Sequence, residues 1–153
     1  LDALLEWNRL YGKAGAVQFQ CLVPSDQARP AFRKILTLAS KGAVASPLAV
    51  IKTTGREGRG MLSFGRPGFS LALDFPRRPS TDALIPQLPA ITNEHGGRLY
   101  LAKDACLTPA ELSQMYPEAE QFKALIREID PEGIMQSDMA RRLGLIGREG
   151  VNR

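Results

Sequence analysis

The stretch AVQFQCLV, residues 16–23, decides how the chain folds, because its apolar and polar side chains alternate. Successive side chains of a β-strand point to opposite faces, so Phe19 and Cys21 share one side and Gln18 and Gln20 the other. The apolar side is expected to pack on a core, with Cys21 as a small core residue. Glutamine is uncommon on solvated strands, and paired amides suit hydroxyl groups or the edge of a heterocycle. The polar side is therefore either a solvated sheet face or a binding surface.

Two further stretches predict strands that pair with the first one. They are PLAVIKTT, residues 47–54, and FSLALDF, residues 69–75. The glycine-rich segment 55–60 predicts a hairpin turn, so residues 61–64 are expected to begin a partner strand. Because tight turns join these strands, the sheet should be largely antiparallel. Its second face would carry the polar or small residues Gln18, Gln20, Lys52, Ser70, Ala72 and Asp74.

Helices are expected between and after these strands. Ser25 should cap a helix that ends at Lys41. Another helix should either open at Pro79 and kink at Pro86 or start only near Pro86, because proline cannot continue the hydrogen-bond ladder. Later helices are indicated by the capping box at 108–111, by apolar spacing over 118–129 and by Ser137 before 138–143, and His95 should close the helix before the last strand.

The order of these elements indicates an α+β domain with helices packed on one face of the sheet. Residues 1–146 are expected to form one domain, with Trp7 and Tyr11 as anchors near its start, and residues 147–153 a disordered tail. The chain begins Leu1-Asp2-Ala3 without an initiator methionine, so we expect it to be part of a longer polypeptide.

Composition excludes several classes of site. The net charge of +4 and the pI of about 9.3 mildly favour anionic partners, although the basic residues are scattered. Two cysteines without CxxC spacing provide neither a disulfide framework nor a zinc pattern. His95 is the only histidine, so no histidine-based metal site or catalytic triad can be completed within the chain. No apolar run approaches the length of a membrane span.

The stretch GGRLYLAKD, residues 96–104, raises the question of what Lys103 faces. It predicts a strand over residues 98–102 that runs into this lysine. In a regular strand Tyr100 and Lys103 would point to opposite faces, so the strand must end or twist near Ala102 for both to reach one pocket. On context alone, Lys103 is either a strand-end lysine in water or a group that faces a ligand.

Five stretches together resemble a known family. They are EWNRLYGKAGAVQFQCLVP at 6–24, SLALDFP at 70–76, GGRLYLAKD at 96–104, MYP at 115–117 and SDMARRLGL at 137–145. In this order the chain resembles the C-terminal half of the oxidase subunits of decaprenylphosphoryl-ribose 2-epimerases. These are vanillyl-alcohol-oxidase-type FAD flavoproteins, a group that also includes the aldonolactone oxidases.

The resemblance implies a substrate (cap) domain whose FAD is held mainly by an N-terminal domain that this chain lacks. It implies oxidation of a sugar or sugar-lipid carbinol, with a reductase as a further partner and no nucleic acid. The expected location is the cytoplasm, with peripheral attachment to the inner membrane left open. The 153-residue chain alone should hold no FAD tightly and show no turnover.

The resemblance also implies roles for single residues. Lys103 would lie near the flavin and the substrate as a catalytic and cofactor-binding group, with Tyr100 as its catalytic neighbour. The substrate-binding residues would be Gln18, Gln20, Lys52, Ser70 and Ala72, and no metal is implied.

This chain departs from the family pattern at three positions. Ser70 and Ala72 stand where the pattern has asparagine and cysteine, and Thr54 lies near a position that is aromatic. The walls of the expected pocket therefore carry smaller side chains. The identity of the sugar and of any lipid carrier stays open.

An alternative from another class is a free-standing module that binds RNA or another anion. A sheet that binds RNA usually displays stacking aromatic residues. Here the strand aromatics Phe19, Phe69 and Phe75 are predicted on the side opposite the glutamines.

Overall fold

The computed structural model describes residues 12–42 and 44–146. The expectations for Trp7, Tyr11 and the tail at 147–153 lie outside these residues. The described part is an α+β fold with one sheet in the order β2-β3-β1-β4, and every pair of neighbouring strands is antiparallel. Its strands are β1 (Ala16–Val23), β2 (Leu48–Thr54), β3 (Gly68–Pro76) and β4 (Arg98–Leu99).

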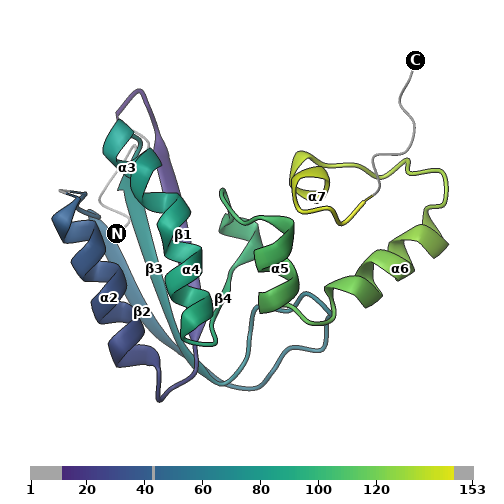
Figure 1. Ribbon diagram of the computed structural model, residues 1–153, viewed down its shortest axis with the longest axis horizontal. Helices are drawn as coiled ribbons and strands as arrows, with labels where there is room; N and C mark the ends of the chain where they lie inside the picture. The colour runs from purple at the N-terminus through teal and green to yellow at the C-terminus, as the bar shows by residue number, and fades with distance from the viewer. Residues whose placement is uncertain (1–11, 43, 147–153) are drawn as a thin grey trace, which may run out of the picture.

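The helices lie on one face of this sheet and beside it (Figure 1). Helices α2 and α4 cover the face, while α5, α6 and α7 continue beyond the β4 edge. The helical elements are α2 (Ala28–Lys41), α3 (Pro79–Leu84), η1 (Ile85–Gln87), α4 (Leu88–Glu94), η2 (Leu101–Lys103), α5 (Pro109–Met115), α6 (Ala119–Ile129) and α7 (Asp138–Arg142). No helix in the described ranges is long and apolar enough to cross a bilayer.

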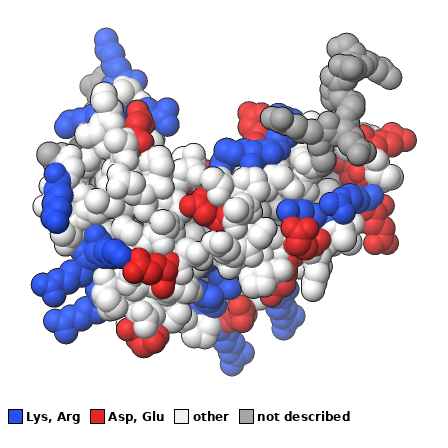
Figure 2. All heavy atoms as spheres, viewed as in Figure 1, with Lys and Arg blue, Asp and Glu red and all other residues white. Residues whose placement is uncertain are grey.

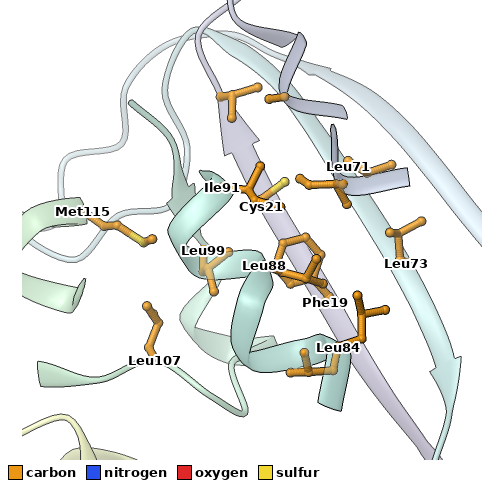
Figure 3. Close-up of a cluster of buried hydrophobic side chains, with 14 of the residues drawn as sticks. Phe19, Cys21, Leu71, Leu73, Leu84, Leu88, Ile91, Leu99, Leu107 and Met115 are labelled. Carbon is orange, nitrogen blue, oxygen red and sulfur yellow. The ribbon is translucent and has the colours of Figure 1, made fainter. Parts of the chain in front are cut away.

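The core lies between the covered face of the sheet and the α3–α4 segment. Phe19 of β1 is opposite Leu73 of β3, and both point toward Leu84 and Leu88 (Figure 3). All four side chains are at most 3% exposed. Each such burial contributes about 1.5–3 kcal/mol, so the alternation in β1 is sufficient to orient the sheet.

Cys21 is a core residue, as its place in β1 predicted. It is fully buried, and this burial raises the pKa of its thiol to about 12. In the unfolded chain the pKa of a cysteine thiol is about 8.5. Between these values the unfolded state releases a proton that the native state keeps, so stability falls as pH rises through this window.

We therefore expect the free energy of unfolding to fall by about 2 kcal/mol between about pH 8 and pH 10.5 through the thiol of Cys21 alone. Urea titrations of the wild type and of Cys21→Ala at both pH values measure this difference. Cys21→Ala should lack this pH-dependent loss of stability. An equal decline in the free energy of unfolding of both proteins would contradict the assignment.

Local signals predicted several helix ends correctly. Pro86 lies in η1, where the α3–α4 helix changes to a 3₁₀ turn, because proline has no N–H for an α-helical bond. Thr108 and Glu111 form the expected capping box, and Ser137 Oγ accepts the Ala140 N–H. His95 Nδ1 lies 2.9 Å from the carbonyl oxygen of Ile91, at the end of α4.

Three local expectations were wrong. Residues 61–64 form no strand, because β2 pairs directly with β3 and the connecting loop closes through the Gly58 N–H and Gly65 carbonyl. Ser25 does not cap α2, which begins at Ala28 after a turn. The strand expected over 98–102 ends at Leu99 and gives way to η2.

Candidate functional site

The face of the sheet opposite the core gathers the substrate residues expected from the sequence. Strand pairing aligns Lys52 with Ser70 in one row, and Ala72 with Gln20 in the next. Gln18 follows in the third row, opposite Asp74. These residues alternate with the buried core residues, so their side chains point away from α2 and α4. No described helix covers this face (Figure 1).

Hydrogen bonds along this face hold the two glutamine side chains. Gln18 Nε2 donates to Asp74 Oδ1 at 2.8 Å, and Gln20 Nε2 donates to Ser70 Oγ at 3.4 Å. Ser70 is only 1% exposed, whereas Gln18 is exposed and Gln20 is intermediate. The amides are thus ordered by their neighbours while both side chains still reach solvent.

Tyr100 extends the pairing of β4 by one residue. Its N–H donates to the carbonyl of Gln20 at 2.8 Å. Leu99, the residue before it, is paired with Cys21 and lies in the core. The alternation therefore puts Tyr100 on the open face, in the row of Gln20.

Lys103 follows within a single 3₁₀ turn. Its N–H donates to the carbonyl of Tyr100 at 2.9 Å, so period-two alternation no longer applies after Tyr100. Tyr100 is the extended N-cap residue of this turn, so the strand alternation that would put Lys103 on the opposite face ends here. The early end of β4 thus removes the conflict between the two residues. Within the described part of the chain, the Lys103 ammonium forms no ion pair.

The loop from β2 to β3 reaches across to β4 and closes one end of the face. The ring of Phe64 lies 4.8 Å from that of Tyr100. Arg98 donates to the carbonyl of Ser63 at 2.8 Å and lies 3.7 Å from Glu57. Arg66 donates to the carbonyl of Gly96.

Arg98 anchors this loop from a buried position. It is 6% exposed, and its guanidinium carbon lies 5.0 Å from the centre of the Tyr116 ring. Burial and the nearby charge of Arg98 lower the pKa of Arg66. Phe64, Arg66 and Arg98 were not predicted as part of the site, because contacts across 30 or more residues leave no local spacing signal.

Asp104 is held next to Lys103 by three donors. Its carboxylate accepts from the N–H groups of Cys106 and Leu107 and from Arg142 Nη2, at 2.8–2.9 Å and 2.7 Å respectively. Asp138 instead pairs with Arg141 in the first turn of α7. The two aspartates therefore pair with different arginines and do not form a carboxylate pair with each other.

A groove of about 380 Å³ lies away from these residues, between α2 and β2, and is lined by Leu36, Ala49 and Phe75 among others. It contains none of the residues expected to bind substrate or flavin. On the open face Gln18 is exposed and Gln20 is half-buried, whereas Ser70 and Asp74 are buried.

Charge over the helix-covered side is mixed. Figure 2 shows basic and acidic side chains interspersed over the side that carries α2 and α4. The strand aromatics Phe19, Phe69 and Phe75 share the core side of the sheet, as their alternation predicted. The strand aromatics are therefore not available for base stacking on the open face, where the aromatic side chains are Tyr100 and the loop residue Phe64.

The chain is similar to known proteins over almost its whole length. A family model described as D-arabinono-1,4-lactone oxidase matches residues 71–143. Decaprenylphosphoryl-beta-D-ribose oxidase of Mycolicibacterium smegmatis is 38% identical over 146 residues, which cover 95% of this chain and 32% of that protein. An uncharacterized protein in the mprA 5′ region of Streptomyces coelicolor is 35% identical over 135 residues, 86% of this chain and 36% of that protein. The chain thus spans about a third of the length of these relatives.

Proposed function

Because this chain is a relative of the D-arabinono-1,4-lactone oxidases and of decaprenylphosphoryl-beta-D-ribose oxidase, we propose that it is the substrate domain of a longer FAD-dependent oxidoreductase. The flavin-binding domain would lie elsewhere in the same polypeptide. The reaction would oxidise a carbinol of a sugar or sugar-lipid to a carbonyl. The proposal applies to residues 1–146 as one domain.

One observation carries this proposal. The sheet face that faces away from the helices gathers Gln18, Gln20, Lys52 and Tyr100 in adjacent rows. A solvated face would not need amides held by cross-strand hydrogen bonds, as Gln18 and Gln20 are. The face supplies amide and ammonium donors beside the apolar side chains of Leu48 and Val50, which strand alternation places on the same side.

These residues fit a flavin and a hydroxylated substrate. A planar ring could lie over the row of Ala72, which presents only a methyl group beside Gln20. When bound, the flavin would accept the hydride that leaves the carbinol carbon, while the hydroxyl proton passes to solvent or a base. The chain's own contribution is to bind, orient and stabilise charge.

Each residue has a separate task in this proposal. The Lys103 ammonium stabilises the negative charge that develops at the edge of the ring, and its lack of a carboxylate partner among the described residues leaves it available. Gln18, Gln20 and Lys52 orient substrate hydroxyls or a phosphate. Ser70 and Ala72 form a small wall, and Tyr100 stacks on Phe64 beside it.

The test uses the flavin-loaded full-length protein that contains this chain. Lys103→Ala should slow flavin reduction at least about tenfold in a stopped-flow single turnover, because a positioned charge is lost. Lys34→Ala is the matched control, since Lys34 pairs with Glu94 on the helix side of the domain. An unchanged rate in Lys103→Ala would count against the role of this lysine. Tight, salt-steep binding of single-stranded RNA by the 153-residue chain would favour the alternative module.

A further inference from the structure

We propose that Arg142 is a positioning residue for Lys103 and acts through the buried carboxylate of Asp104. Arg142 lies in α7, 38 residues after Asp104 in the chain, and would influence the site without touching the substrate. The consequence for catalysis rests on the proposed role of Lys103. The placement of the lysine side chain can be measured independently of that role.

The contact is a two-point clamp. Arg142 Nη2 donates to Asp104 Oδ2 at 2.7 Å, and Arg142 Nη1 donates to the carbonyl of Leu107 at 2.5 Å. One planar guanidinium thus joins both ends of the segment that follows η2. The Asp104 side chain has no exposed surface, so solvent screens this pair less than a surface ion pair.

The clamp fixes the backbone directly after Lys103. The N–H of Asp104 donates to the carbonyl of Leu101 and closes η2. On the other side of the lysine, the N–H of Tyr100 is tied to Gln20 of β1. Lys103 is therefore held between one anchor in the sheet and one anchor on α7. Loss of either anchor would free the turn that carries the ammonium.

Charge gives a second reason for the same assignment. Asp104 is adjacent to Lys103, so its carboxylate could attract the ammonium away from the open face. Arg142 and the N–H groups of Cys106 and Leu107 already satisfy this carboxylate. Removing Arg142 would leave a buried anion with an adjacent lysine as its nearest replacement partner.

The neighbouring arginine provides a matched control. Arg141 bonds only locally, to Gln136 and to Asp138, whose side chain is fully exposed. Arg141→Met and Arg142→Met change the same side chain at adjacent positions of α7. Only Arg142→Met should change the placement of the Lys103 side chain.

The first experiment is a double-mutant cycle in the flavin-loaded full-length protein. Arg142→Met should slow flavin reduction about tenfold when Lys103 is present, because small displacements of a positioned group have large effects on rate. In a Lys103→Met background the same change should slow it less than about twofold. Arg142→Lys, which keeps the charge but loses the planar fork, should recover part of the rate. Equal slowing in both backgrounds would show a general structural effect and overturn the proposal.

The second experiment separates this inference from the proposed function. The rate at which acetic anhydride acetylates Lys103 is measured by mass spectrometry. This rate should change at least about threefold in Arg142→Met and stay unchanged in Arg141→Met, because only Arg142→Met frees the turn. If Lys103→Met leaves flavin reduction unchanged, the proposed function fails, and the acetylation rate alone decides whether Arg142 places this lysine. An unchanged acetylation rate in Arg142→Met overturns the inference.

Discussion

Gly68→Ala should destabilise the chain by about 3 kcal/mol or more, since it combines backbone strain with a steric overlap. Gly68 begins β3 with φ of 155°, a conformation that side chains of L-residues rarely adopt. A Cβ at this position would overlap the backbone carbonyl oxygen of Val23 and lie 3.1 Å from its carbon. Because both atoms belong to the backbone at the end of β1, no side-chain rotation can relieve the overlap.

Urea unfolding followed by circular dichroism measures this loss. Gly55→Ala is the matched control, because a Cβ there meets nothing within 4 Å and the backbone has no positive φ. It should change the free energy of unfolding by no more than about 0.5 kcal/mol. Equal losses in both variants would mean that the close approach of Gly68 to Val23 has no special cost.

Phe19→Ala should destabilise the chain by about 3–5 kcal/mol, the range for removing a buried aromatic ring. Phe19 is 3% exposed and lies in the centre of the cluster formed by β1, β3 and α4 (Figure 3). The ring is surrounded by Leu73, Leu84 and Leu88, which cannot collapse fully into the space it leaves.

The control for this variant is the next residue along the strand. Gln20→Ala changes a side chain on the opposite face whose hydrogen bond to Ser70 is long, at 3.4 Å. We expect it to cost less than about 1 kcal/mol. The same urea titration compares the two variants. Similar losses would contradict the assignment of the two faces of β1.

The loop between β2 and β3 shows where sequence patterns were misleading. Its glycines indicated a tight hairpin turn, and residues 61–64 looked like the next strand. In the fold, β3 already occupies the partner position, so the loop is free to cross toward β4. Its ordering depends on Arg98 and Tyr100, which are distant in sequence. The path of this loop therefore depends on tertiary contacts and could not be predicted from the local sequence.

The candidate site also has one part that local patterns predicted and one part that they did not. Alternation within β1 and β3 predicted which face Gln18, Gln20, Ser70 and Ala72 share, because side-chain direction along a strand is a local property. The position of Lys103 relative to Tyr100 was not predicted. It depends on a strand that ends at Leu99 and on a 3₁₀ turn that the sequence signals did not indicate.

By itself, the sequence determined β1, β2 and β3, most helix ends and the division of β1 into a core side and a polar side. These depend on interactions between residues a few positions apart, which propensity and periodicity record. Tertiary structure alone decided the order β2-β3-β1-β4, the closure of the face by Phe64 and Arg98, and the clamp from Arg142 to Asp104. Those features depend on contacts between segments 30 or more residues apart, whose geometry exists only once the core has brought the segments together.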